Sequence, residues 1–286
     1  MKIISKITFI MLLAIALPAH AAIRVATPSD TVTAARMVSE LRAMPGGTSI
    51  GPRVAAAAVM LTGVAAGQPL DNDSTGTAII GFERTDGLGL VNMAMALAQA
   101  AGSPLGRWQD YGEALVNVSR RRGEDTGFAS KMMYGADWVT DNVYRGNISD
   151  LTERYSGSNV FKTKSLDKIS LNRADYPALA DSATYEALRM VEMGYRTHKI
   201  PHLKKETLSK KDILEDLRDG DIIMMLSSDP RFDIYDIGIV HIQPDGPHFI
   251  HVSPSTGKVV EEAEVLPRWF KKENQYFYGY RWLRPE

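Results

Sequence analysis

Apolar residues in the N-terminal half of the chain recur at helical spacing. Within 31–43, Val32, Ala35 and Val38 fall on one helical face, and 88–101 is a largely apolar run that ends at a Gly-Ser-Pro turn. This periodicity predicts helices over 31–43, 51–66, 88–101, 108–121, 129–144, 184–194 and 209–218.

From residue 221 onward the pattern changes to short β-rich runs separated by Pro-Asp-Gly-Pro and Pro-Ser-Thr-Gly turns. We expect strands over 222–226, 237–242, 248–252, 259–261 and 276–282, and a further strand with turns within 158–171. Helices followed by strands predict an α+β fold, with N-terminal helices packed on a C-terminal antiparallel sheet. No internal repeat interrupts the chain, so we expect one domain over 22–286.

The first residues predict export. Lys2 and Lys6 precede the apolar run 7–17, and Ala19-His20-Ala21 is a small-residue cleavage site. We therefore expect a signal peptide over 1–21, cut after Ala21, and a periplasmic or secreted protein. The apolar run is too short to span a bilayer, and no second long apolar segment follows, so we expect no membrane span after cleavage.

Composition narrows the possible functions further. The net charge of −1 gives no electrostatic argument for binding nucleic acid or an anionic membrane. The chain contains no cysteine, which excludes disulfides, a lipid anchor on cysteine and a thiol nucleophile. An exported domain of this length can nevertheless be stable on its hydrophobic core alone.

Residues 83–92 read Glu-Arg-Thr-Asp-Gly-Leu-Gly-Leu-Val-Asn and lead directly into the predicted helix 88–101. This segment resembles the strand-to-helix turn of NlpC-type papain-like cell-wall peptidases, in particular their N-acetylmuramoyl-L-alanine amidase-like branch. That branch has Asp-Cys-Thr-Thr-Phe-Val-Glu, and its cysteine opens a helix whose macrodipole favours the thiolate. Asp86 and Val91 match the pattern, whereas Gly87 stands at the position of the catalytic cysteine.

The resemblance continues through most of the mature chain and implies a papain-like fold. Residues 236–240 match the family's His-Val-Gly-Ile-Val, whose histidine is the general base, and Asp236 stands in its place. His251 matches the histidine of Leu-Met-His-Ala-Ser, the third, orienting group. Residues 131–142 resemble the family's Arg-Met-His-Tyr…Asp-Trp-Ile…Asn, but Gly-Val-Ala-Ala at 63–66 replaces its Gly-Thr-Pro-Tyr.

The chemistry that the resemblance implies is therefore incomplete. A thiol peptidase needs a nucleophile, a base and a group that orients the base. Gly87 offers no side chain, and Asp236 cannot replace an imidazole as a base near neutral pH. We expect a catalytically inactive amidase-like protein that needs no cofactor and binds peptidoglycan or muropeptide fragments.

Candidate ligand-binding residues follow from the same comparison. Asp86 and Ser253 lie beside the degenerate catalytic positions Gly87, Asp236 and His251. Tyr134, Trp138 and Asn142 are spaced i, i+4 and i+8, which places them on one face of a helix. That face either packs in the core or lines the substrate groove, and the pattern leaves both interpretations open.

Two alternative functions remain at this point. One is a hydrolase with a relocated nucleophile, for which Thr85 and Ser253 are candidates, or with a metal at Asp86, Asp236 and His251. Ser253 and His251 are strand neighbours at i, i+2, which rarely meet well enough for proton transfer. We also expect no metal at these three residues. The other alternative is a module that binds another periplasmic protein.

Overall fold

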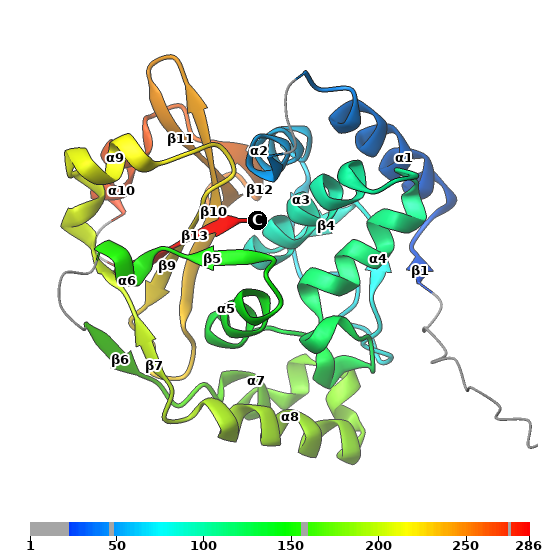
Figure 1. Cartoon of the computed structure of the whole chain (residues 1–286). Helices are drawn as coiled ribbons and strands as arrows, with labels where there is room; N and C mark the ends of the chain where they lie inside the picture. The colour runs from blue at the N-terminus through cyan, green and yellow to red at the C-terminus, as the bar shows by residue number, and fades with distance from the viewer. Residues whose placement is uncertain (1–22, 46–48, 156–159, 274–275) are drawn as a thin grey trace, which may run out of the picture.

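The computed structural model describes residues 23–45, 49–155, 160–273 and 276–286 (Figure 1). The expected signal peptide, 1–21, lies outside these residues. Within them, no helix is long and apolar enough to cross a membrane.

The N-terminal half forms a group of helices around a buried central one. α3 (Gly87–Gly102) packs against α1 (Pro28–Arg42), α2 (Ile50–Met60) and α4 (Trp108–Ser119) (Figure 1). Because α3 contacts helices on several sides, it is apolar around most of its circumference, as expected for an interior helix. The four helices agree with the periodicity to within a few residues, except at the end of α2.

A nine-stranded sheet forms the other half of the molecule. Its order is β4 (Arg84–Thr85), β2 (Ala65–Ala66), β12 (Lys258–Glu261), β11 (Gly246–Ser253), β10 (Ile234–Gln243), β9 (Ile222–Ser227), β13 (Phe277–Pro285) and β5 (Ile148–Asp150), with β8 (Leu203–Lys204) also beside β13. Two smaller pairs lie apart from it, namely β1 (Arg24–Val25) with β3 (Ile79–Ile80) and β6 (Phe161–Thr163) with β7 (Lys199–Pro201). The expected α+β class is confirmed.

The expectation of a wholly C-terminal, antiparallel sheet needs correction. β2 and β4 come from the N-terminal half and pair in parallel at one edge, whereas the pairs from β12 to β5 are antiparallel. β2 occupies residues that we expected at the end of a helix over 51–66. That helix ends at Met60, and Gly63 with φ of 90° turns the chain into the strand.

Strand β9 separates two hydrophobic cores because its side chains alternate between the faces of the sheet. Ile222 and Met224 join the core beneath the helices, whereas Ile223 and Met225 join a second core. That second core includes Trp282, α9 (Lys211–Asp216) and α10 (Leu266–Lys272), which lie beyond the opposite face of the sheet in Figure 1.

The middle of the chain differs most from the predicted elements. The expected helix 129–144 begins only at α5 (Gly135–Tyr144), because the buried Asp233 accepts hydrogen bonds from the amides of Gly135 and Ala136 at 2.9 and 2.6 Å. Within 158–171, only β6 is a strand, and α7 (Lys168–Leu171) follows it. The remaining elements are α6 (Thr152–Tyr155), α8 (Ser182–Tyr195) and the 3-10 turns Arg121–Gly123, Phe128–Ser130, Arg173–Asp175, Pro177–Ala180 and Lys205–Ser209.

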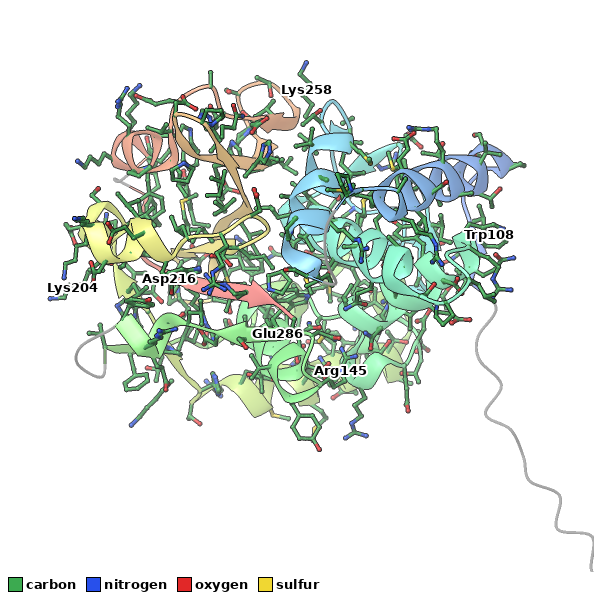
Figure 2. The ribbon with its side chains drawn as sticks, turned by 45° about the horizontal axis from the view of Figure 1, so that its top comes forward. Trp108, Arg145, Lys204, Asp216, Lys258 and Glu286 are labelled. Atoms are coloured by element: carbon green, nitrogen blue, oxygen red, sulfur yellow. The ribbon has the colours of Figure 1, made fainter. Side chains whose placement is uncertain are left out.

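Several long charged side chains lie on the outside of this arrangement. Figure 2 shows Lys204 and Lys258 directed away from the ribbon, and both are exposed. Arg145 instead returns to the surface of its own helix, where its Nε lies 2.6 Å from a carboxylate oxygen of Asp141.

Candidate functional site

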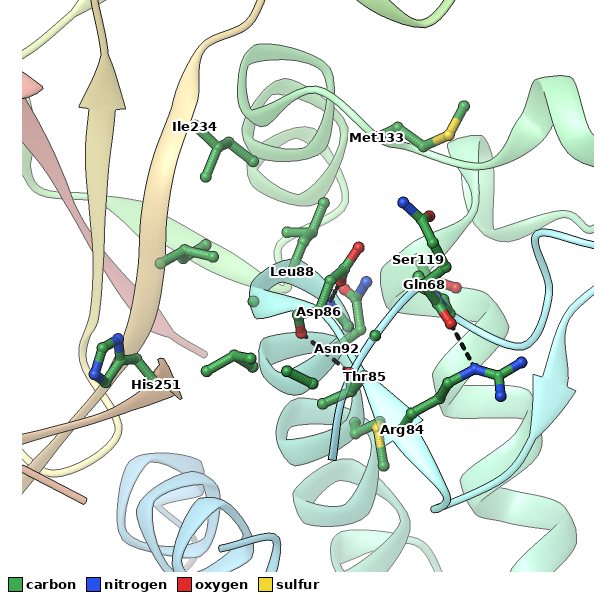
Figure 3. Close-up of a pocket in the computed structure, with 18 of the residues that line it drawn as sticks. Gln68, Arg84, Thr85, Asp86, Leu88, Asn92, Ser119, Met133, Ile234 and His251 are labelled. Atoms are coloured by element: carbon green, nitrogen blue, oxygen red, sulfur yellow. Dashed lines mark hydrogen bonds between the residues drawn. The ribbon is translucent and has the colours of Figure 1, made fainter. Parts of the chain in front are cut away.

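A pocket of about 940 Å³ lies where the N-terminus of α3 meets the sheet (Figure 3). Strands β10 and β11 form one wall, and the loop 67–72 forms another. Asp86, Gly87, Asp236, His251 and Ser253, five of the residues expected to form a site, all line it. Other lining residues include Gln68, Asp71, Arg84, Asn92, Lys131, Tyr235, Glu262, Trp269 and Glu273.

Asp86 caps the N-terminus of α3 and lines the pocket. It is the N-cap residue, and its Oδ1 accepts a hydrogen bond of 2.7 Å from the amide of Gly89. The amides of Gly87 and Leu88 belong to the first helical turn, where no intrahelical acceptor exists. The Asp86 side chain is exposed to solvent beside the pocket.

Gly87 and Asp236 are neighbours in space. A Cβ atom placed on Gly87 would lie 3.8 Å from Oδ1 of Asp236 and 3.1 Å from Cγ2 of Ile237. A side chain at position 87 would therefore reach Asp236, and Ile237 would have to shift slightly to admit it.

His251 lies between two carboxylates. Its Nδ1 is 2.7 Å from Oδ2 of Asp236, and its Nε2 is 2.9 Å from Oε1 of Glu262. Because ionised carboxylates only accept hydrogen bonds, both ring nitrogens donate, and this arrangement is that of an imidazolium.

The environment of His251 supports this charge state. The imidazole is 3% exposed, and this burial by itself lowers its pKa. The hydrogen bonds and charges of Asp236 and Glu262 outweigh burial, so the pKa of His251 is raised above its usual value. The ring also stacks on Phe249, with centroids 5.2 Å apart, and meets Trp269 edge-on at 4.9 Å. The imidazole is therefore in contact with two carboxylates and two aromatic rings.

Three expected ligand-binding residues do not line the pocket. Tyr134, Trp138 and Asn142 are at most 2% exposed, so the interpretation of their shared helical face as a groove wall is corrected to a core face. The Trp138 indole donates a hydrogen bond of 2.8 Å to Oδ1 of Asn92, which does line the pocket. Asn142 donates to the backbone carbonyls of Val118 and Trp138, which explains how an amide is accommodated in this core.

The alternative nucleophiles and metal ligands have other partners. The Thr85 hydroxyl donates to the carbonyl of Asp86 at 3.0 Å, and the Ser253 hydroxyl lies 2.9 Å from that of Ser255. Among the described residues, no three His, Asp or Glu side chains form a group that could hold a metal ion. The set of Asp86, Asp236 and His251 is therefore not assembled as a metal site.

Sequence reasoning did not find Glu262, which completes the histidine network. It follows β12, whose Val260 pairs with His251, and its amide donates to the carbonyl of Phe249 at 2.9 Å. An acidic residue just beyond a strand is the only local signal, and the register that brings it to His251 depends on strand pairing.

Comparison with known proteins places this pocket in a family context. The family model described as AmiA-like, N-acetylmuramoyl-L-alanine amidase-like, matches residues 65–274, which include both walls of the pocket. No curated protein matches the chain at a significant level.

Solved structures share the fold. An N-acetylmuramoyl-L-alanine amidase from Bacteroides uniformis is 23% identical with a TM-score of 0.73, and the match covers 83% of this chain and 99% of that one. A protein from Legionella pneumophila is 16% identical with a TM-score of 0.67, covering 90% of this chain and 94% of its own. At these identities the likeness establishes the architecture.

Proposed function

The chain belongs to the N-acetylmuramoyl-L-alanine amidase-like family, and we propose that it is an exported, catalytically inactive member that binds peptidoglycan fragments. The proposal comprises a single papain-like domain of NlpC type over 22–286, released to the periplasm or the exterior after loss of 1–21. The observation that carries it is that Gly87, which stands where the resemblance places the nucleophile, lines the pocket with no side chain. The imidazole of the site, bonded at both nitrogens, adds to this.

Two requirements of acyl transfer are missing independently. Residue 87 has no side-chain atom to attack a carbonyl carbon, so no covalent intermediate forms there. A general base needs a free lone pair near neutral pH, and His251 has none while it donates to both Asp236 and Glu262. Restoring either group alone leaves the other requirement unmet.

The hydroxyl groups near the site do not substitute for the thiol. Thr85 is buried, and its hydroxyl hydrogen bond runs to the backbone of Asp86. The hydroxyl of Ser253, at the end of its strand, is hydrogen-bonded to the hydroxyl of Ser255 in the turn that follows. Neither bond leads to His251, so neither hydroxyl has a base to accept its proton.

The pocket nevertheless keeps features that bind a peptide. Gly87 and Leu88 line a pocket with room for a ligand, their amides have no hydrogen-bond acceptor among the described residues, and a carbonyl oxygen is a suitable acceptor for them. Binding energy in hydrolases comes largely from contacts remote from the reacting bond, and these survive loss of the nucleophile. We expect micromolar to millimolar affinity, roughly 4–8 kcal/mol.

The test is incubation of the purified mature chain with muropeptides, followed by mass spectrometry. We expect the N-acetylmuramoyl-L-alanine bond to remain intact to the level of a heat-denatured control. Cleavage above that level contradicts the inactive state. If the folded chain leaves muropeptides intact and also fails to bind them, the pocket serves another ligand, and a periplasmic protein partner becomes the favoured function.

A further inference from the structure

The loop 68–77, whose residues 68–72 form one wall of the pocket, has few backbone attachments. Among the described residues, no backbone-to-backbone hydrogen bond joins 68–77 to another element, and the amide of Asn72 bonds only to Pro69 within the loop. The preceding Gly67 is paired with the carbonyl of Thr85. Side chains must therefore determine where this wall lies.

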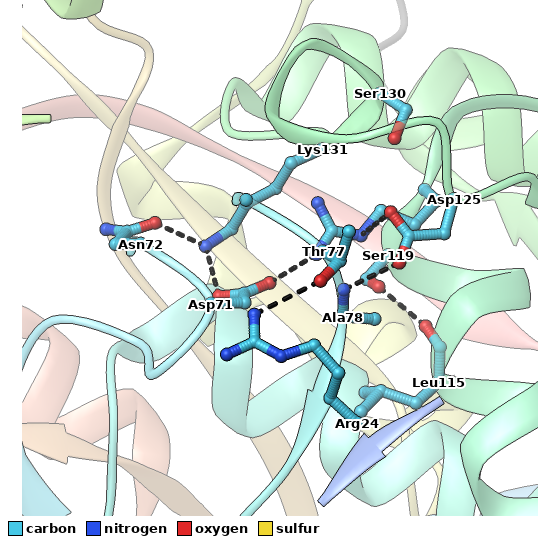
Figure 4. Close-up of polar contacts among 12 residues, drawn as sticks. Arg24, Asp71, Asn72, Thr77, Ala78, Leu115, Ser119, Asp125, Ser130 and Lys131 are labelled. Atoms are coloured by element: carbon cyan, nitrogen blue, oxygen red, sulfur yellow. Dashed lines mark hydrogen bonds and ion pairs between the residues drawn. The ribbon is translucent and has the colours of Figure 1, made fainter. Parts of the chain in front are cut away.

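Asp71 makes the most buried ion pairs of the loop (Figure 4). One of its carboxylate oxygens lies 2.6 Å from Nη2 of Arg120, and the other lies 2.5 Å from Nζ of Lys131. The same ammonium group donates to Oδ1 of Asn72 at 2.6 Å. Arg120 follows α4 and Lys131 precedes α5, and an isolated antiparallel β-bridge pairs these two residues, so adjacent cations hold one carboxylate.

The burial of Arg120 makes loss of this attachment energetically unfavourable. Its side chain is 0% exposed, and its Nε and Nη1 have no hydrogen-bond partner among the described residues. Its other acidic neighbour, Asp125, is 3.8 Å away. If Asp71 moved away, a buried guanidinium would lose its close counter-charge, which is strongly unfavourable.

The remaining attachments of the loop are more exposed or apolar. Arg24 pairs with Asp73 at 2.7 Å, with side chains 40% and 34% exposed, and such surface pairs contribute little. Arg84 donates to the carbonyl of Gln68 at 3.0 Å. Leu70 packs so closely on Gly81 that a Cβ there would lie 2.3 Å from the leucine Cδ1.

We infer that Asp71, Arg120 and Lys131 form an ion-pair latch that fixes the pocket wall and so positions Gln68, Asn72 and Lys131 for the ligand. Breaking the latch should affect the loop alone, because its residues join the loop to the helices and do not join the helices to the sheet. The inference rests on the proposed function only where ligand affinity is measured, since the position of the wall can be followed without any ligand.

The experiment compares amide hydrogen exchange in the native chain and in Asp71→Asn. We expect exchange at 72–76 to become about tenfold faster or more, which corresponds to ~1.4 kcal/mol of local opening, while α3 keeps its native rate. Glu40→Gln, which removes the exposed Arg36–Glu40 pair at 2.8 Å, is the matched control and should change neither region.

Two results would overturn the latch: unchanged exchange at 72–76, or an equal increase throughout the domain. Should Asp71→Asn fail to fold, Lys131→Met retains the Arg120 pair and tests the second half of the latch by the same measurement. The double variant Asp71→Asn with Arg120→Met removes the buried charge and should recover global stability but not loop protection.

Affinity for muropeptides separates this inference from the proposed function. If the native chain binds them, Asp71→Asn should weaken binding at least tenfold, and unaltered affinity would contradict a positioning role. If the native chain binds none, the proposed function fails, while the exchange rates still decide whether the latch exists.

Discussion

Oδ2 of Asp236 lies 2.7 Å from Nδ1 of His251, and this contact puts a carboxylate where the family resemblance expects the general base. The residue at the base position accepts a hydrogen bond, and the residue at the orienting position is the imidazole. With Glu262 on its other nitrogen, the histidine serves as a charged link between β10, β11 and the end of β12. The pocket therefore contains an ionic network where a hydrolase would hold a base.

The first prediction concerns pH. Because the pKa of His251 is raised in the folded chain, the folded state binds its proton more tightly than the unfolded state. This contribution to stability is fully present below about pH 6.5, the unfolded pKa, and is lost as the pH rises through the folded pKa. As the pH rises through this range, urea unfolding should show the free energy of unfolding of the native chain falling toward that of the His251→Gln variant. A difference between the two proteins that grows with rising pH would contradict the imidazolium.

The second prediction concerns Trp138. Truncation to alanine should lower the free energy of unfolding by about 3–5 kcal/mol, because the indole is fully buried in the core. Trp138→Phe keeps most of the packing and removes the hydrogen bond to Asn92, so its loss should be smaller. Denaturant unfolding measures both. Full stability in Trp138→Ala, together with weaker ligand binding, would restore the groove interpretation.

The cap of α3 gives the third prediction. Asp86→Ala removes the acceptor for the Gly89 amide and should destabilise the chain by about 1 kcal/mol, whereas Asp86→Asn should be nearly neutral. Thermal or denaturant unfolding of the two variants makes the comparison. Equal losses in both would show that the negative charge of Asp86, and not its capping geometry, is what α3 requires.

The sequence predicted elements that depend on local interactions, but it did not predict contacts that depend on residues far apart in the chain. The helix expected over 88–101 is α3 at 87–102, and the strand expected over 222–226 is β9 at 222–227, because local periodicity determines both. The network around His251 depends on strand register, which no local pattern specifies.

The placement of Trp138 and the latch at Asp71 show the same limit. Trp138 and Asn142 lie one turn apart in α5, whereas Tyr134 precedes the helix as its N-cap residue, and helical spacing could not tell which neighbours bury these three side chains. Asp71 meets Arg120 and Lys131 across 49 and 60 residues of chain. Only the tertiary structure brings such partners together.

The fourth prediction restores the missing thiol. Gly87→Cys should be labelled by iodoacetamide, whereas the native chain, which has no cysteine, should not. The position at a helix N-terminus favours the thiolate. Cleavage of muropeptides by this variant should stay at background, because His251 remains bonded to two carboxylates.

Adding Asp236→His to Gly87→Cys supplies a second imidazole and should yield a trace of cleavage at most. The new Cβ must displace Ile237, 3.1 Å away, and small errors in position lower rates by orders of magnitude. Mass spectrometry of the products measures the outcome. Substantial turnover by Gly87→Cys alone would show that the His251 network does not block base catalysis.

Titration calorimetry of the native, folded chain with muropeptides tests the central claim most directly, because it reports binding and turnover together. The account predicts saturable heat that returns to baseline after each injection, with a dissociation constant between about 1 µM and 1 mM. Sustained heat after each injection, the signature of continuing hydrolysis, would contradict the loss of activity. A complete absence of heat would contradict the binding of peptidoglycan fragments.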